Sequence, residues 1–208
     1  MIGILRLVMA ALVATLPVVG VAEAPASGGQ ASSVAPTAGA PAFADLLAEA
    51  QMRLDVPEGF VSVPVDPNPL FLYDSALASP DGAIEVRYAV RPLSRIVVDY
   101  DDPHSSVPDP NHMFPLMFQS MVTLLSNGRH SPTGEYPPDQ ARERFNADWA
   151  AAAVFDMSAE FDAGQRQALV VAMHKNRLAD AYAIFLFDDY QQVKPQIDQA
   201  LGALRFSR

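Results

Sequence analysis

The distribution of apolar residues divides the chain into three parts. Residues 7–16 are apolar throughout except for Thr15, whereas residues 23–42 consist mainly of Ala, Pro, Ser and Gly. In the rest of the chain, apolar positions recur with the periods of helices and strands, which is typical of a folded core. The pattern predicts a single globular domain over residues 43–208, preceded by a signal peptide at 1–22 and an extended linker at 23–42.

The first part of the chain has the features of an export signal. Arg6 is the positive residue ahead of the apolar run, and Pro17 interrupts any helix after it. Gly20 and Ala22 are small residues spaced as at a signal cleavage site. The alternative is an uncleaved membrane anchor, but the apolar run of about 15 residues is shorter than the roughly 20 that a spanning helix needs. We therefore expect a Sec-type signal, a periplasmic or secreted protein, and no stable membrane span after cleavage.

The first half of the domain is expected to contain short elements. Residues 43–54 have helical spacing, although the last three of them could instead form a strand. Brief strands are expected at 60–63 and 70–73. Residues 83–93 alternate between apolar and other positions, which is typical of a strand with one face toward the core.

A longer helix follows a Pro-rich acidic loop. Asp109 is a favourable N-cap and Pro110 suits the first helical position, so a helix is predicted to begin there. It is expected to run to about Ser126, because Asn127 and Gly128 are typical of a helix end.

The second half of the domain determines the predicted fold class. A helix is expected to begin at Pro138, with Phe145 and Trp149 on one face. Strands are expected at 150–157, 167–175 and 181–187. A last helix should have Pro195 in its first turn and Leu204 on its apolar face. The strands at 167–175 and 181–187 are apolar on both faces, so they belong in the middle of a sheet covered on two sides. Because consecutive strands are joined by tight turns, we predict an α+β fold, a mainly antiparallel sheet covered by helices on both faces (an α/β/α sandwich).

Three segments of the domain carry a family resemblance. They are Leu54–Phe60, which contains a Pro-x-Gly-Phe turn, Glu85–Tyr88 followed by Pro92, and Phe145–Trp149 ahead of the last strands and helix. Together they resemble the PsbP-like superfamily, named for an extrinsic protein of photosystem II, over most of residues 50–206. The resemblance implies an α/β/α sandwich and a non-enzymatic binding or accessory role, as in bacterial envelope members, and it supplies no catalytic residues.

The composition argues against several classes of partner and chemistry. A formal net charge of −10 repels phosphate backbones, so a nucleic-acid partner is not expected. The absence of cysteine excludes disulfides, thiolate nucleophiles and Cys-type metal sites. No phosphate-binding glycine loop is present, and no cofactor is expected.

The acidic loop offers groups for a divalent cation. Four potential ligands precede the helix at 110–126, namely Asp99, Asp101, Asp102 and His104. Carboxylate oxygens suit calcium, but the loop lacks the turn glycine and the closing glutamate of a calcium-binding loop. A solvated acidic loop is the alternative interpretation.

The helix at 110–126 has few polar residues and no Asp, Glu, Lys or Arg. A helix that covers one face of a sheet should keep a polar side toward solvent. Its outer face is therefore a candidate for contact with a partner or an apolar ligand, through Met113, Met117, Phe118 and Met121. The alternative is that neighbouring segments cover this face.

Polar side chains at two other places are further binding candidates. Asn146 and Asp148 lie beside the single tryptophan, where they could face a ligand or bond to backbone amides. Arg87 shares a strand face with Arg91 and Arg95, where it could bind an acidic group or pair with acids of the protein itself.

These features favour an exported, non-enzymatic binding or accessory protein of the cell envelope, whose partner is an envelope protein or a small ligand. The alternatives are a small secreted hydrolase that uses Asp, Glu and His residues, and a divalent-metal-binding protein. Neither a Gly-x-Ser-x-Gly motif nor a His-x-x-x-His spacing supports these alternatives.

Overall fold

The computed structural model describes residues 42–96 and 109–207. The predicted signal peptide, all but the last residue of the predicted linker, and the loop with Asp99, Asp101, Asp102 and His104 lie outside the described residues. The elements in chain order are α1 (Phe43–Glu49), β1 (Met52–Leu54), β2 (Val61–Val63), β3 (Ser75–Ala78), β4 (Glu85–Pro92), the 3-10 helix η1 (Leu93–Arg95), α2 (Pro110–Leu125), β5 (Thr133–Glu135), α3 (Pro138–Phe145), β6 (Trp149–Asp156), β7 (Gln167–Lys175), β8 (Ala179–Phe187), α4 (Tyr190–Ala200) and β9 (Leu204–Phe206).

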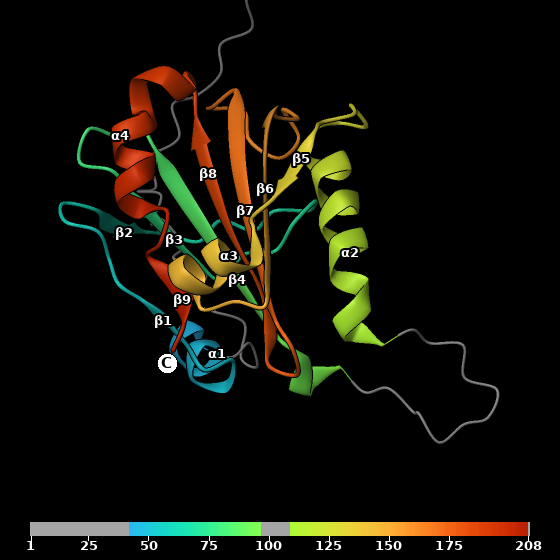
Figure 1. Ribbon diagram of the computed structural model, residues 1–208. Coiled ribbons are helices and arrows are strands. Elements are labelled where there is room, and N and C mark those ends of the chain that lie inside the picture. Colours follow the sequence, from blue (N-terminus) through green and yellow to red (C-terminus); the bar gives the residue numbers. More distant parts are fainter. Residues whose placement is uncertain (1–41, 97–108, 208) are drawn as a thin grey trace, which may run out of the picture. The chain divides into compact units, whose positions relative to one another are not determined.

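The main sheet has seven strands in the order β2-β3-β4-β8-β7-β6-β5, and all neighbouring pairs are antiparallel (Figure 1). β7 and β8 pair over their whole lengths, from Gln167 opposite Phe187 to Lys175 opposite Ala179. Nearly all their side chains are buried, as expected for interior strands covered on both faces. The predicted central pair of strands is confirmed. β1 and β9 form a separate two-stranded sheet.

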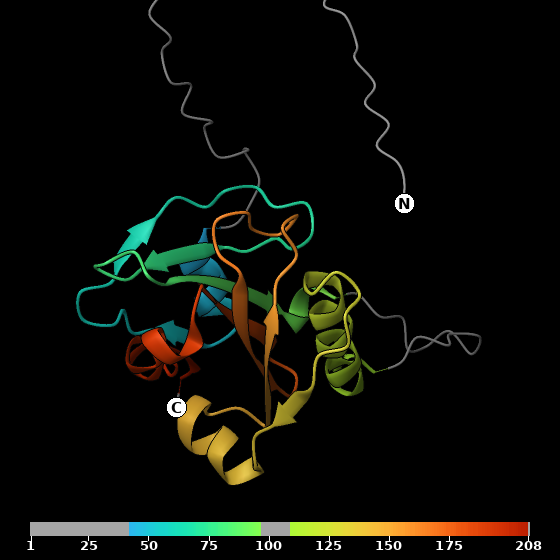
Figure 2. The same ribbon diagram turned by 90° about the horizontal axis from the view of Figure 1, so that it is seen from above.

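Helices cover both faces of the main sheet, α2 on one and α1, α3 and α4 on the other (Figure 2). On the α2 face, Phe114 and Phe118 pack with strand residues such as Ile184. On the opposite face, Phe145 of α3 and Ile197 of α4 pack in a separate cluster of buried residues that includes Phe185 of β8. The predicted fold class, α+β with a mainly antiparallel sheet between helical layers, is therefore confirmed.

The ends of α2 follow from local hydrogen bonds and backbone angles. The side chain of Asp109 accepts a bond from the backbone N–H of Asn111 at 2.9 Å, which satisfies an otherwise unpaired donor of the first turn. Asn127 and Gly128 have φ angles of 56° and 75°, a left-handed conformation that ends the helix. The predicted N-cap and helix end are confirmed.

Two expectations about the region before β4 and the helix after β5 are wrong. Residues 70–73 do not form a strand, because Asn68 Oδ1 accepts bonds from the backbone N–H groups of Leu70 and Phe71 and holds a turn there. Trp149 is not on a helix face, because α3 ends where Asn146 adopts a φ angle of 53°. Trp149 instead begins β6.

Two expectations about the carboxyl-terminal region are also wrong. Pro195 lies inside α4 rather than in its first turn, because the helix begins at Tyr190 after the N-cap Asp189. Leu204 lies in β9, opposite Leu54 of β1, rather than on the helix. A strand of three residues shows no periodicity of its own, and only its pairing partner distant in sequence defines it.

Candidate ligand-binding site

The outer face of α2 is apolar and partly exposed. Leu116, Met117 and Leu124 are 59%, 52% and 49% exposed, and no residue of the helix carries an Asp, Glu, Lys or Arg side chain. Among residues 42–96 and 109–207, no helix combines the length and apolar character needed to cross a bilayer.

The predicted binding residues of α2 fall on different sides of the helix. Met117 is exposed and Met113 is half-buried, whereas Phe118 and Met121 are buried against the sheet. Phe118 and Met121 are core residues, because positions three or four apart share one helix face and this face meets the sheet. The accessible part of the predicted set is therefore centred on Met117.

Met117 borders a cavity of about 460 Å³, which we call the α2 cavity. Its apolar walls are formed by Leu46, Phe71, Val90, Pro92, Ile96, Met117 and Tyr182. The cavity lies beside the last part of β4, beyond the point where β3 stops pairing at Ser75. There the carboxylate of Asp74 takes the place of a strand and accepts the backbone N–H of Val90 at 2.8 Å.

The charged side chains at the α2 cavity are paired with other charged side chains. Arg91 Nη1 donates to Asp74 Oδ2 at 2.6 Å. Arg95 Nε donates to Glu49 Oε2 at 2.8 Å. These pairs hold residues 72–74 and α1 against the end of β4, and so shape the rim of the cavity.

A largely buried His174–Asp180 pair lies beside the α2 cavity, which Asp180 lines. His174 Nδ1 is 2.6 Å from Asp180 Oδ1, and its Nε2 is 3.1 Å from Asn176 Oδ1. Burial alone would lower the pKa of His174, but the hydrogen bond to Asp180 and the charge of that carboxylate outweigh burial and raise the pKa. The ring of His174 stacks on Phe114 of α2, with centroids 5.2 Å apart.

The two residues of the pair line different cavities, since a smaller cavity of about 280 Å³ borders His174. Asp180 lines the α2 cavity, and His174 lines the smaller one together with Asp148 and Trp149. The predicted binding residue Asp148 therefore lies beside the indole, where its Oδ2 accepts the backbone N–H of Asn176 at 3.0 Å.

The other predicted binding residue of this segment, Asn146, lines neither cavity. Its Nδ2 donates to the backbone oxygen of Ser207 at 2.7 Å, and its own backbone oxygen accepts a bond from Lys175 Nζ at 2.6 Å. The structure thus places Asn146 at the junction of the chain's last residues with α3 and β7.

Arg87 is buried on the α2 face of the sheet and lines neither cavity. Its Nε donates to Glu85 at 2.6 Å and its Nη2 to Asp162 at 2.5 Å. The guanidinium also lies over the rings of Tyr73 and Phe161, 4.9 Å and 5.1 Å from their centroids. Arg87 therefore ties the segment after β6 to the sheet.

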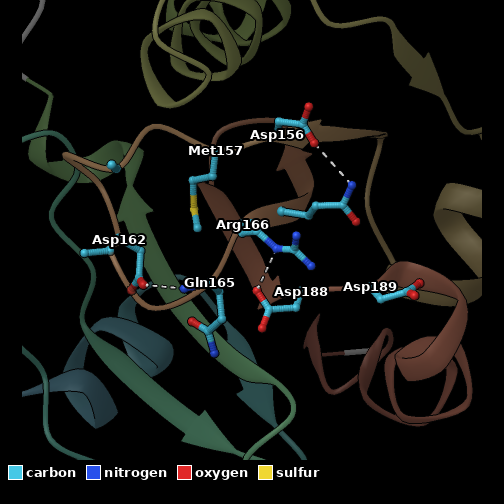
Figure 3. Close-up of a pocket in the computed structure, with 10 residues that line it drawn as sticks. Asp156, Met157, Asp162, Gln165, Arg166, Asp188 and Asp189 are labelled. Atoms are coloured by element: carbon cyan, nitrogen blue, oxygen red, sulfur yellow. Dashed lines mark hydrogen bonds and ion pairs between the residues drawn. The ribbon is translucent and has the colours of Figure 1, made fainter.

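A polar hollow of about 630 Å³ lies between the ends of β6 and β8, and its carboxylates have partners within the protein (Figure 3). Asp162 accepts the backbone N–H of Gln165 at 3.1 Å, and Arg166 pairs with Asp188 at 3.4 Å. Asp189 is the N-cap of α4. These contacts explain the acidic residues of the hollow as parts of the local fold.

The metal hypothesis rests on residues that the structure does not describe. Asp99, Asp101, Asp102 and His104 lie between the two described stretches of chain. Within those two stretches, no group of three or more His, Cys, Asp or Glu side chains is arranged to hold a metal ion.

Comparison with known proteins relates the chain to solved structures but not to a family model. No protein-family model matches this chain, and no curated protein sequence matches it either. The chain is similar to the solution structure of cyanobacterial PsbP (CyanoP) from Synechocystis sp. PCC 6803, with a TM-score of 0.43 and 10% sequence identity over 76% of this chain and 88% of that chain. The likeness concerns the fold alone.

Sequence reasoning missed His174, Asp180, Tyr182 and Phe71 as residues of the site. One signal was available for the first two. In an antiparallel hairpin closed by Lys175 opposite Ala179, the next pair outward is His174 opposite Asp180. The approach of Phe71 to Tyr182, with ring centroids 5.6 Å apart, joins a loop to a strand more than 100 residues later and has no local signature.

Proposed function

We propose that this protein is an exported, non-enzymatic binding protein of the cell envelope, and that it holds an apolar ligand in the α2 cavity. The observation that carries the proposal is the apolar-walled cavity beside the exposed side chain of Met117. The leader-like residues 1–22 support the part of the proposal that concerns export.

The size and lining of the α2 cavity suit a small molecule. Its volume of about 460 Å³ falls within the range of roughly 300 to 1,000 Å³ that is typical of small-molecule sites. An apolar ligand would remove part of Met117 and Ile96 from water, at a gain of about 25 cal/mol for each Å² of apolar surface. Methionine is unbranched and flexible, so Met117 can adapt to ligands of different shape.

The charged groups around the cavity support binding without chemistry. Arg91 is paired with Asp74, Arg95 with Glu49, and Asp180 with His174. Groups paired in this way fix the shape of a site, whereas a nucleophile or general base must be able to reach a substrate.

A fluorescence titration tests the proposal. The hydrocarbon probe diphenylhexatriene, which brightens in apolar surroundings, should bind the purified protein saturably. Met117→Glu should raise the probe's Kd by about tenfold or more, because a carboxylate at the cavity wall must be desolvated when the probe binds.

Leu124→Glu is the matched control. Leu124 is as exposed as Met117 and lies two turns further along α2, but it does not line the cavity. Its substitution should change the probe's Kd by less than about twofold. Absence of saturable binding to the wild-type protein, or equal weakening by both substitutions when both variants keep the wild-type circular dichroism spectrum, would overturn the proposal.

A further inference from the structure

The electrostatics of the α2 cavity disfavour a charged ligand. Each charged residue that lines the cavity already faces an opposite charge. These residues are Asp74, Arg91, Arg95 and Asp180. A ligand carboxylate would meet the negative charges of Asp180 and Asp74, and a ligand ammonium would meet the positive charges of Arg91 and Arg95. Moving an ion out of water without a partner of its own is costly.

Tyr182 brings a hydrogen-bond donor to this mostly apolar site. Tyr182 is 6% exposed, and the centroid of its ring lies 5.6 Å from that of Phe71 and 5.7 Å from that of Phe114. Burial raises the pKa of Tyr182, and the charge of Asp180 raises it further, so the hydroxyl stays protonated at neutral pH. Among residues 42–96 and 109–207, no group forms a hydrogen bond with this hydroxyl.

Asp180 brings an acceptor to the same place. Asp180 and Tyr182 are two residues apart on β8, so both side chains project from the α2 face of the sheet. Asp180 Oδ1 is bonded to His174, and within the described part of the chain no hydrogen bond reaches its second oxygen. Neither of these two polar atoms is among the fully buried, unpartnered side-chain atoms of the described chain, which are Tyr88 Oη and Arg205 Nε. The Tyr182 hydroxyl and the second Asp180 oxygen therefore offer a donor and an acceptor to a ligand group in the cavity that both residues line.

On these grounds, and resting on the proposed function, we infer that the α2 cavity takes an uncharged apolar molecule that carries one hydroxyl or amide group, which accepts a hydrogen bond from Tyr182 and donates one to Asp180. A hydroxyl has one donor and two acceptor positions, so it can make both bonds without bringing a charge. The apolar body of the molecule would lie against Phe71, Ile96 and Met117.

Displacement of bound diphenylhexatriene by three ten-carbon amphiphiles near neutral pH tests the inference. Decanol, decanoate and decylamine share one alkyl chain and differ in the charge of the head group. Decanol should displace the probe at a concentration about tenfold or more below those needed for the two ions. Tyr182→Phe should weaken the competition by decanol about three- to tenfold, after correction for the Kd that the variant itself shows for the hydrocarbon probe.

The outcomes separate this inference from the proposed function. If the probe binds and Met117→Glu weakens it, but decanoate or decylamine competes as well as decanol, the ligand class is wrong and the apolar site stands. The same holds if Tyr182→Phe leaves the competition by decanol unchanged. If the probe does not bind the wild-type protein at all, both the proposed function and the ligand class are overturned.

Discussion

His174 and Asp180 face each other across the β7–β8 hairpin, with Nδ1 of the imidazole 2.6 Å from Oδ1 of the carboxylate. The histidine side chain is 4% exposed and the aspartate side chain 15%. A protonated imidazole satisfies both of its neighbours, because it donates from Nδ1 to Asp180 and from Nε2 to Asn176 Oδ1. Through this pair, Asp180 at the α2 cavity is joined to the ring of Phe114 on α2, the helix that also carries Met117.

The stability of the protein should depend on the protonation of His174. The pKa of His174 is raised in the folded state. A histidine of this kind stabilises the fold fully below its unfolded pKa of about 6.5, and this contribution is lost as the pH rises through the folded-state pKa. Thermal unfolding followed by circular dichroism should therefore show a Tm that decreases from about pH 6.5 upward.

His174→Asn is the variant that isolates this effect, and His112→Asn, at an exposed position on α2, is its control. The first substitution should remove the decrease in Tm over that range, and the second should retain it. A wild-type Tm that is constant or rises above neutral pH would contradict the assignment of the protonated imidazole.

Arg87 should be essential for the position of the segment after β6. Replacing Arg87 with Leu leaves the partly buried carboxylates of Glu85 and Asp162 without their counter-charge. Loss of one partner of a buried ion pair typically costs about 3 to 5 kcal/mol, and we expect the free energy of unfolding in urea to fall by an amount near the lower end of this range, about 3 kcal/mol.

The same variant should become sensitive to limited proteolysis between β6 and β7, because Arg87 also donates to the backbone oxygen of Phe161. Arg166→Leu is the control, since its pair with Asp188 is largely exposed. Similar unfolding curves for the two variants would show that Arg87 does not hold this segment in place.

Gly59 should be required for its turn on two separate grounds. Its φ angle is +80°, which side chains rarely adopt, and an added Cβ would come within 2.9 Å of Pro80 Cγ. Gly128 has a similar φ angle of +75°, but an added Cβ there meets nothing within 4 Å. Gly59→Ala should therefore lower the free energy of unfolding by about 2 to 3 kcal/mol, and Gly128→Ala by about 1 kcal/mol.

The difference in lost stability between the two glycine variants measures the cost of the clash with Pro80. The cost of placing a side chain at a positive φ angle is nearly the same in both variants. Urea unfolding followed by tryptophan fluorescence suits the comparison, since Trp149 is the single tryptophan and packs against Phe114 and Phe118. Equal losses of stability would mean that Pro80 moves aside at no cost.

Export should leave a mature protein that begins at Glu23. When the chain is expressed with its leader in a bacterial host, mass spectrometry of the envelope or culture fraction should find this amino terminus. Ala22→Leu should block cleavage and leave the leader attached, whereas Ala24→Leu should not. A mature form that retains Arg6 would show that the apolar run acts as an anchor.

The sequence predicted the fold best where a segment carries enough apolar residues to show its own period. β7 and β8 are apolar on both faces, and this alone places them inside a covered sheet. The predicted range of α2 agrees with the structure to within one residue, since Asp109 and Gly128 are local signals of its ends. β5 and β9 were missed because strands of three residues are defined only by the partners with which they pair.

The candidate site could be predicted only in part. Met117 was identified because an uncharged helix is conspicuous in any sequence, but Phe118 and Met121 could not be separated from it without knowledge of which face meets the sheet. Arg87 was noted as a residue that could pair with acids, yet its partner Asp162 lies 75 residues away. Such a contact depends on chain topology, which local patterns do not encode.

By itself, the sequence determined that the chain is acidic and cysteine-free and that the central strands of its sheet lie between layers of helices. These properties follow from composition and from the period of apolar residues. Only the tertiary structure decided that Phe71, Met117 and Tyr182 meet around one cavity, which Asp180 of the His174–Asp180 pair also lines. The physical reason is that a binding site is made by contacts between segments distant in sequence, and the packing of the whole chain brings them together.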